Sequence, residues 1–218
     1  MVRKTYRKPR KGAAAAGSDD ISRRIITAAL ELSAAEGWRS LSLAGIADEA
    51  GVGLAELHQA FASKTAILVG FLKTIDAKVL AGGKGDADED PRDRLFEVLM
   101  RRFDALNPHK AAISGILRET LFDPAAASVL APRFIHSMAW MLEAAGLSSA
   151  ELGGRLRVNG LALLYMYALR VWLGDDSQDM AKTMAALDKG LRRAEWLAAR
   201  LRCPGAARGK QASAAGDA

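Results

Sequence analysis

Apolar residues recur at intervals of three and four along almost the whole of this 218-residue chain, and no stretch alternates apolar with polar residues. The first pattern gathers apolar side chains on one face of an α-helix, whereas a half-buried strand needs the missing alternation. In segment 43–50, for example, Leu43, Ile46, Ala47 and Ala50 fall at i, i+3, i+4 and i+7. The sequence therefore predicts an all-α fold of about nine helices.

Capping residues, glycines and prolines mark where these helices begin and end. Helices are predicted from Asp19 or Asp20 to Gly37, from Leu43 with Ser42 as N-cap to Gly51, at 54–61, and after Ser63. Five more follow, with Pro132 expected to begin a new segment or a kink. The predicted domains are a disordered basic arm at 1–18, a helix-turn-helix head at 19–80, a linker at 81–91, a body at 92–203 and a disordered tail at 204–218.

The formal net charge of +6 is concentrated at the amino terminus. The first eleven residues hold six of the 31 basic residues and no acid, which leaves 25 basic residues against 25 acidic ones. The arm is either a phosphate-seeking tail or a solubilising terminus. The single cysteine, Cys203, excludes an internal disulfide. The apolar stretch 161–173 is shorter than the ~20 residues that span a bilayer, so we expect a cytoplasmic protein with no integral membrane segment.

The spacing of the three amino-terminal helices is typical of a DNA-binding motif. Three short helices, the second and third joined by a turn that contains Gly51, are typical of a helix-turn-helix. In that motif one helix enters the major groove of DNA. The run from residue 25 reads IITAALELSAAEGWRSLSLAGIADEAGVGLAELHQAFASKTAIL. It resembles the amino-terminal domain of TetR-type regulators through the Ala28-Ala29 pair, Ile46-Ala47, the Ala50-Gly51-Val52 step, and Phe61 followed by Ser63-Lys64.

That resemblance implies a function for each part of the chain. The helix at 54–61 would read DNA, Ser42 and Lys64 would touch phosphates, and the body would dimerise and bind an effector. The residues predicted to bind the DNA operator are Arg3, Arg7, Ser42, Leu54, Glu56, His58, Gln59 and Lys64.

The head differs from the family pattern at positions that face DNA. Gly53, Ala55, His58 and Ala60 stand where hydroxyl-bearing, glycine or aromatic residues are usual, and the reading helix has no Arg or Lys to pair with guanine. Residues 19–78 carry six basic and eight acidic side chains. Neutralisation of phosphates would therefore depend heavily on the arm.

A second resemblance lies in the body. The stretch NGLALLYMYALRVWLGDDSQDMAKTMAALDKGLRRAEWLA looks like the carboxy-terminal domain of coenzyme Q accessory proteins, through Leu164-Tyr165, Trp172-Leu173 and Asp176-Ser177. Those proteins have a TetR-like fold and bind lipids such as ubiquinone intermediates. Read without the family, the acids and hydroxyl at 175–179 cap a helix, with a metal site as the alternative.

Aromatic and sulfur-containing residues of the body form either a plain core or the wall of an apolar pocket. The predicted ligand-binding residues are Phe103, Ile116, Leu117, Met138, Met141, Tyr165 and Trp172. Met184, Leu187 and Leu191 form an apolar stripe predicted to make a homodimer, although a monomer could equally bury it.

No catalytic or metal-binding motif is present in the sequence. The three histidines lie far apart, and there is no nucleophile elbow, phosphate loop or paired-carboxylate motif. We therefore expect a protein that is not an enzyme and has no cofactor or metal. The first hypothesis is a dimeric regulator that binds an operator and an apolar or lipid-like small molecule. The alternative is a lipid-binding accessory protein of ubiquinone biosynthesis that does not bind DNA.

Overall fold

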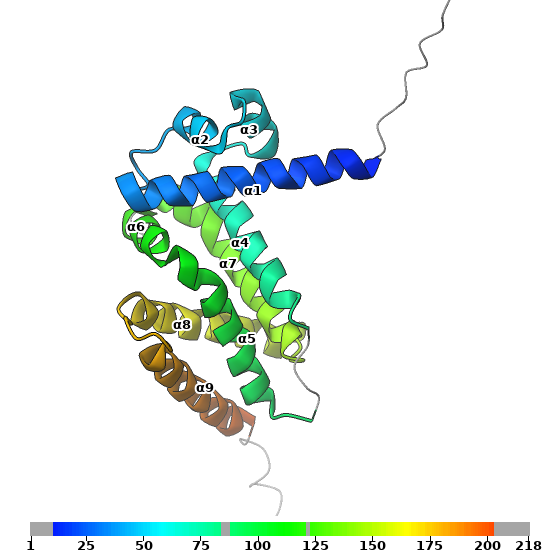
Figure 1. Ribbon diagram of the computed structural model, residues 1–218. Coiled ribbons are helices and arrows are strands. Elements are labelled where there is room, and N and C mark those ends of the chain that lie inside the picture. The colour runs from blue at the N-terminus through cyan, green and yellow to red at the C-terminus, as the bar shows by residue number, and fades with distance from the viewer. Residues whose placement is uncertain (1–10, 84–87, 121–122, 203–218) are drawn as a thin grey trace, which may run out of the picture. The chain divides into compact units, whose positions relative to one another are not determined.

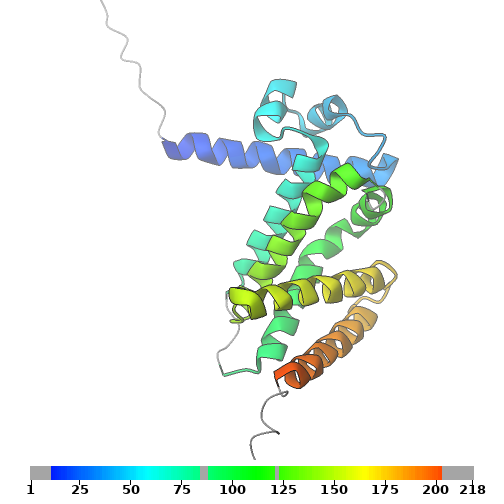
Figure 2. The ribbon, with the colours of Figure 1, turned by 180° about the vertical axis from the view of Figure 1, so that it is seen from behind.

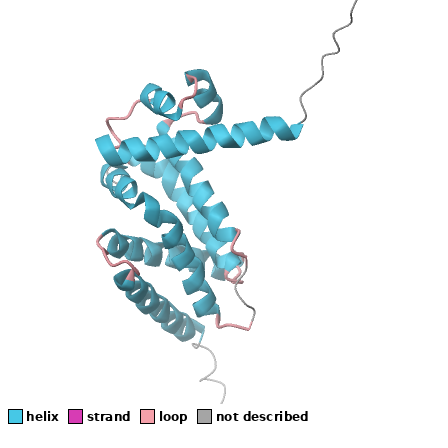
Figure 3. Cartoon of the chain, in the orientation of Figure 1, coloured by secondary structure: helices cyan, strands magenta, loops and turns pink. Residues whose placement is uncertain are grey.

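The computed structural model describes residues 11–83, 88–120 and 123–202. All regular structure in these residues is helical, and Figure 3 shows helices joined by loops without a strand. The all-α prediction is confirmed. The elements, labelled in Figure 1, are α1 (Lys11–Glu36), α2 (Leu43–Ala50), α3 (Leu54–Ala60), α4 (Lys64–Leu80), α5 (Pro91–Leu106), the 3-10 turn η1 (Asn107–His109), α6 (Lys110–Thr120), α7 (Pro124–Ala144), α8 (Glu151–Leu173) and α9 (Ala181–Arg202).

The chain forms two compact units. Among the described residues, unit 1 takes in 11–78, 105–120 and 123–134, and unit 2 takes in 79–83, 88–104 and 135–202. Each unit is therefore built from two separate segments of the sequence, whereas the predicted head and the predicted body are each one continuous segment. Helices α4, α5 and α7 each contribute residues to both units.

In unit 1, α2, α3 and α6 pack against α1 (Figure 1). The apolar face of α1 supplies Ile25 and Ala29, which are 0% and 1% exposed, and α2 and α3 add Ile46 and Leu57 at 0% and 1%. Burying one aliphatic side chain of this size contributes about 1.5–3 kcal/mol. The two short helices are therefore held mainly by packing against a long one, because helices of eight residues or fewer are marginal alone.

The ends of the head helices follow the predicted signals. The Ser42 hydroxyl accepts a hydrogen bond from the Gly45 amide at 2.9 Å, and Gly51 ends α2 in the left-handed conformation with φ of 61°. The Ser63 hydroxyl accepts one from the Ala66 amide at 3.1 Å at the start of α4. These caps satisfy amides that have no partner inside their helices, and they confirm the predicted boundaries.

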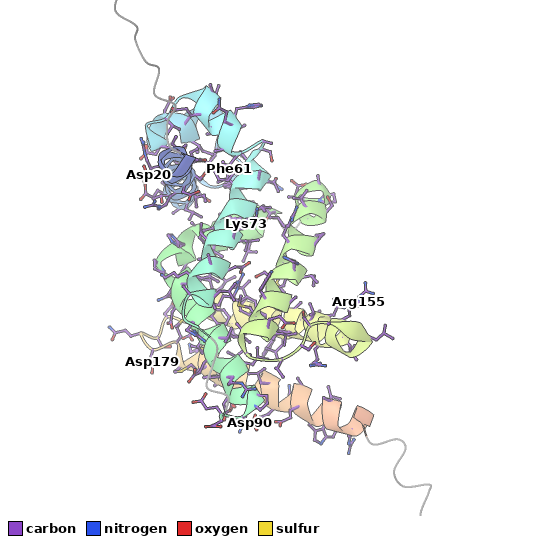
Figure 4. All side chains as sticks on the ribbon, turned by 90° about the vertical axis from the view of Figure 1, so that its right-hand side faces the viewer. Asp20, Phe61, Lys73, Asp90, Arg155 and Asp179 are labelled. Carbon is purple, nitrogen blue, oxygen red and sulfur yellow. The ribbon has the colours of Figure 1, made fainter. Side chains whose placement is uncertain are left out.

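Gly70 allows α4 to approach the ring of Phe61, which is labelled in Figure 4. A Cβ atom on Gly70 would lie 2.6 Å from Cε1 of Phe61 and 3.3 Å from Cδ1 of Ile26. The first separation is shorter than any ordinary carbon contact. Residue 70 therefore has to be glycine for Phe61 to occupy its place in unit 1.

One predicted helix start is wrong, and one of two alternatives at Pro132 is excluded. Helix α1 begins at Lys11 rather than near Asp19, because Ala13 to Ala16 favour helix and extend it before the acidic pair. Pro132 lies inside α7, so no new helix begins there, and the predicted alternative of a kink stays a prediction. Pro132 and Ser128 are both exposed, so the Ser128 carbonyl that loses an amide partner to the proline can face water.

In unit 2, α8 and α9 pack against each other, as Figure 2 shows from behind. Asp175, in the turn between them, is 2% exposed. Its carboxylate accepts hydrogen bonds from the amides and hydroxyls of Ser177 and Thr183, at 2.5–3.2 Å. The Ser177 hydroxyl in turn accepts one from the Ala181 amide at 3.0 Å. The cluster at 175–179 is therefore a cap of α9, as predicted.

Burial of the Asp175 carboxyl opposes its ionisation, but the hydrogen bonds from Ser177 and Thr183 outweigh this effect and hold its pKa well below the usual 3.8. Asp175 is therefore ionised at neutral pH, and its charge also favours the amino-terminal end of α9.

Candidate functional site

The outer face of α3 carries the residues predicted to read DNA. Leu57 faces inward and is 1% exposed, whereas Leu54 is 55% exposed and His58 and Gln59 are also exposed. The turn before α3 is short, and Gly53 has an extended backbone at the start of the helix. These exposed side chains are thus accessible to a DNA duplex.

Glu56 lies at the first turn of α3. Its carboxylate accepts a hydrogen bond from the Gly53 amide at 2.8 Å, which satisfies one of the free amides at the start of α3. The same carboxylate places a negative charge at the helix end that would otherwise attract a phosphate. Glu56 is therefore a structural cap that weakens the anion affinity of this end of α3.

Ser42 is a predicted phosphate contact that lies among the described residues. The Ser42 hydroxyl is exposed but already caps α2, so the group left to donate to a phosphate there is the hydroxyl hydrogen. Arg3 and Arg7 lie outside the described residues. Their contact with DNA stays a prediction.

Lys64 has a structural role that the sequence did not indicate. Its Nζ donates to the carbonyls of Trp38 at 2.8 Å and Leu41 at 2.7 Å, and lies 5.2 Å from the centre of the Trp38 ring. Burial lowers the pKa of Lys64, while the charge of Glu119 opposes that effect. The ammonium fixes the segment between α1 and α2, and its hydrogen-bonding capacity is largely used there.

Glu119, at the end of α6, holds the other side of the same segment. Its Oε2 accepts a hydrogen bond from the Arg39 amide at 2.5 Å, and its carbonyl accepts one from Arg39 Nη2 at 3.3 Å. Gly37 turns the chain there with φ of 85°, which favours glycine. The contact spans eighty residues of sequence, so no local pattern could have identified it.

Arg24 joins α1 to the turn of the helix-turn-helix. Its Nη2 donates to the carbonyls of Ala50 at 2.6 Å and Gly51 at 2.7 Å. A guanidinium at the carboxyl end of α2 satisfies free carbonyls and complements the negative end of that helix. Arg24 therefore helps to fix the turn that precedes α3.

Unit 2 contains the aromatic cluster that was predicted to bind a ligand. The ring of Phe103 stacks on Tyr165, with centroids 4.8 Å apart and an interplanar angle of 13°, and lies 5.9 Å from the ring of Trp172. These three residues, with Met138 and Met141, are at most 1% exposed. The five residues therefore lie in the interior of one unit.

Arg102 is buried beside this cluster at 1% exposure. Its Nη1 lies 4.0 Å from Sδ of Met141, and its guanidinium carbon lies 5.6 Å from the centre of the Tyr165 ring. The sequence did carry a signal, because Arg102 falls among Leu95, Val98, Leu99 and Phe103 at the spacing of a buried helix face. A charged residue at such a position costs several kcal/mol to bury, so it indicates a specific role.

The remaining predicted ligand residues lie in unit 1. Ile116 on α6 is 7% exposed and Leu117 is half-buried. The seven predicted residues are thus divided between the two units. A ligand site formed by all of them stays a prediction.

The predicted dimer stripe is turned toward the interior of unit 2. Leu187 and Leu191 are 0% and 5% exposed within the single chain, and Met184 is half-buried. Dimer contacts through these residues stay a prediction. The exposed large apolar side chains of α8 and α9 are others: Leu152, Leu156, Leu163, Met166, Tyr167, Trp196 and Leu197.

Two further features can be judged from the structure: groups of side chains that could bind a metal ion, and helices that could span a membrane. Within residues 11–83, 88–120 and 123–202, no group of three His, Cys, Asp or Glu side chains is arranged to hold a metal ion. None of the helices described there has the length and hydropathy needed to cross a bilayer.

Comparison with known proteins agrees with this geometry. Residues 25–70 match the family model described as bacterial regulatory proteins, tetR family, and this segment contains α2, α3 and the turn between them. No curated protein matches the chain. The coenzyme Q accessory resemblance is therefore without support from these comparisons.

Solved structures match over most of the chain. The TetR transcriptional regulator from Nitrosomonas europaea ATCC 19718 is 22% identical with a TM-score of 0.68, covering 81% of this chain and 98% of its own. A TetR transcriptional regulator from Rhodococcus sp. RHA1 is 21% identical with a TM-score of 0.61, covering 81% and 96%. The multidrug binding protein EbrR, complexed with imidazole, is 22% identical with a TM-score of 0.53, covering 87% and 97%.

The geometry and the comparisons together define the class of protein. The chain is an all-α protein with an amino-terminal helix-turn-helix. Its head matches the tetR family of bacterial regulatory proteins, and the chain has the fold of TetR transcriptional regulators.

Proposed function

We propose that this protein is a dimeric transcription regulator that binds an operator through α3 and responds to an apolar small molecule. The observation that carries the proposal is the outer face of α3, where Leu54, His58 and Gln59 are exposed on a helix that Leu57 anchors. The match of residues 25–70 to the tetR family supports it independently.

The charge of the head shapes how it would bind DNA. His58 and Gln59 are polar groups suited to base edges, and Glu56 would repel the phosphates on either side. Arg24 and Lys64 are bonded to backbone carbonyls of the head, so they serve its structure first. The arm at residues 1–11 then supplies most of the cations available to phosphates, and affinity falls steeply with salt.

Binding of the full chain to its own upstream DNA, measured by fluorescence anisotropy across a salt series, tests this proposal. We expect saturable binding that His58→Ala or Gln59→Ala weakens and that Lys73→Ala, an exposed change on α4, weakens less. Deletion of residues 1–11 should lower the slope of log affinity against log salt by about 0.9 for each phosphate that the arm neutralises. Absence of binding at about 50 mM salt would reject the regulator.

Glu56 offers a sharper form of the same test. Glu56→Gln keeps an oxygen that can accept the Gly53 amide and removes the negative charge, so α3 retains its cap. We expect tighter DNA binding than in the wild type, with the gain largest at low salt. Unchanged affinity would mean that this end of α3 does not approach DNA.

The proposed dimer uses the exposed apolar face of α8. Leu152, Leu156, Leu163 and Tyr167 follow one another at helical spacing and are 84%, 65%, 75% and 55% exposed. Large apolar side chains exposed along one helix face are typical of a protein interface. A Leu163→Glu, Tyr167→Glu variant should be a folded monomer in light scattering, whereas Val129→Glu, on unit 1, should remain dimeric. A wild type that is monomeric at micromolar concentration would end this part of the proposal.

The proposed effector site includes the aromatic cluster of Phe103, Tyr165 and Trp172. Its apolar surroundings suit an apolar ligand, and Arg102 beside it would favour one that carries a negative or strongly polar group. Solvent extraction of the purified protein, followed by mass spectrometry, should recover such a molecule. Tyr165→Ala should change how much is retained, while Trp140→Ala, which removes a 47% exposed aromatic ring on α7, should not.

A further inference from the structure

A pocket lies within unit 1. Its volume is about 220 Å³, and it lies between α1 and the segment that begins α6. Leu30, Glu31 and Ala34 line it from α1. Pro108, His109 and Ala112 line it from η1 and α6. The pocket is therefore formed by the helix that supports the helix-turn-helix, by η1 and by the first turn of α6.

The floor of this pocket is apolar and its rim carries one charge. Leu30 and Ala112 are 4% and 3% exposed, so they present a packed apolar surface. Glu31 is exposed at the rim, where its carboxylate can meet a ligand without first losing a partner inside the core. A site of this kind combines apolar contact area with a single polar group that fixes orientation.

The imidazole of His109 contributes an uncharged wall. Burial lowers the pKa of His109, the positive charge of Lys78 lowers it further, and Glu31 opposes both. The ring meets Phe71 edge to face, with centroids 5.4 Å apart and an interplanar angle of 87°, which fixes its position. At neutral pH the ionised group that lines the pocket is therefore Glu31, with the ammonium of Lys78 near enough to act on His109.

Volume limits the size of the occupant. A cavity of about 150 Å³ holds a benzene molecule, so 220 Å³ is enough for one ring with a short side chain. We propose that this pocket binds a small apolar amine, with its ammonium group beside Glu31 and its ring or chain against Leu30 and Ala112. The proposal is independent of DNA binding, because it concerns the free protein.

An occupant of this pocket would touch both α1 and α6. The same two helices approach again further along, where a Cβ on Gly115 of α6 would lie 3.8 Å from the Ser33 carbonyl of α1, and Glu119 of α6 accepts the amide of Arg39 in the segment that follows α1. A ligand that binds only the folded arrangement stabilises it in proportion to the logarithm of its concentration over Kd. The amine would thus strengthen the packing of α6 on the helix that carries α2 and α3.

Benzylamine is the probe for this site, with benzyl alcohol and benzoate as neutral and anionic analogues of similar size. Titration of the full-length protein, followed by amide chemical shifts, should give saturable benzylamine binding with shifts gathered in residues 27–34 and 108–112. Glu31→Gln should weaken binding by up to about fivefold, the effect of losing one exposed charge pair. The matched change Glu36→Gln, on the same helix outside the pocket, should leave Kd unchanged.

Filling the pocket provides the second arm of the experiment. Ala34 is exposed on α1, so Ala34→Met adds a side chain to the pocket without disturbing the core, and it should abolish the benzylamine shifts. Circular dichroism establishes that each variant is folded. Benzoate binding as tightly as benzylamine, or unchanged benzylamine binding in Ala34→Met, would overturn the proposal.

Discussion

The helix-turn-helix end of unit 1 and the aromatic core of unit 2 are stabilised by different means. In unit 1, charged side chains bond to backbone groups: Lys64 and Glu119 hold the segment between α1 and α2, and Arg24 holds the end of α2. In unit 2, the largest buried side chains are three aromatic residues and Arg102, with Trp172 at 0% exposure and Phe103 stacked on Tyr165. Both regions have a packed core, but the helix-turn-helix end adds hydrogen bonds from charged side chains to its turns, whereas the centre of unit 2 depends on the packing of large side chains.

This difference follows from what each region has to bury. Helices α2 and α3 are short and expose most of their surface, so their turns need side chains to satisfy free amides and carbonyls. Helices α8 and α9 are long enough to bury continuous apolar faces. The head should therefore respond to charge and pH, and the core of unit 2 should respond to changes in volume.

The largest effect is expected for Trp172→Ala, since removal of a fully buried aromatic ring leaves a cavity. We expect a loss of about 3–5 kcal/mol in the free energy of unfolding, measured with urea. Trp196→Ala is the matched control, because Trp196 is 54% exposed. Removal of that exposed ring should cost less than about 1 kcal/mol. Equal losses in the two variants would contradict the packing account of unit 2.

Lys64→Met should have the next largest effect, because it removes a donor from buried carbonyls of the 38–41 segment. We expect a loss of about 1–3 kcal/mol in the free energy of unfolding. Lys73→Met, an exposed change on the same helix α4, should leave stability nearly unchanged. If instead Lys64→Met kept full stability and reduced only DNA affinity, Lys64 would be a phosphate contact and would not stabilise unit 1.

Acid should weaken unit 1 before unit 2. The pKa of His109 is lowered from 6.5, so below pH 6.5 the unfolded chain binds a proton that the folded chain does not, and stability falls as the pH falls. The pKa of Asp175 is lowered from 3.8, so its contribution is present above pH 3.8 and is lost only below it. Urea unfolding between pH 8 and pH 5 should show a decline that His109→Gln flattens, with His136→Gln as the control.

The smallest effect is expected for Ser33→Ala. Ser33 is 3% exposed, and among the described residues its hydroxyl oxygen has no hydrogen-bond partner. Because removal of this hydroxyl sacrifices no bond, we expect a change within about 0.5 kcal/mol in the free energy of unfolding, and in the stabilising direction. A loss well above that size would point to a bound water or a shifted rotamer at the packing of α1 on α6.

Much of the fold was predictable because it depends on local signals. Ser42, Gly51 and Ser63 mark helix ends through bonds to residues at most four positions away, so the sequence itself carries the information. The start of α1 was misplaced because the acidic pair at 19–20 resembles a cap, although the alanines before it also favour helix. A new helix at Pro132 was one of two expected outcomes, and it does not occur because a proline is tolerated where its turn of helix faces water.

The candidate site was less predictable, since its important contacts join distant residues. The exposed side chains of α3 were identified from helical spacing and resemblance. The clamp of Glu119 on Arg39 and the pocket between α1 and α6 depend on helices that meet only after folding. Leu187 and Leu191 illustrate the same limit, because an apolar stripe can face either the interior of its own chain or a partner. The spacing of apolar residues shows that one face of a helix is apolar, but it does not show what packs against that face.

Gly70 carries a consequence for the sequences that can encode this fold. Every single-nucleotide change that replaces a glycine codon with another amino acid introduces a Cβ atom, and at this position that atom would meet the ring of Phe61 at 2.6 Å. An acceptable replacement therefore requires a second change that shortens or removes the ring. Replacing either residue first gives a less stable protein. We therefore expect Gly70 and Phe61 to be retained together in related sequences.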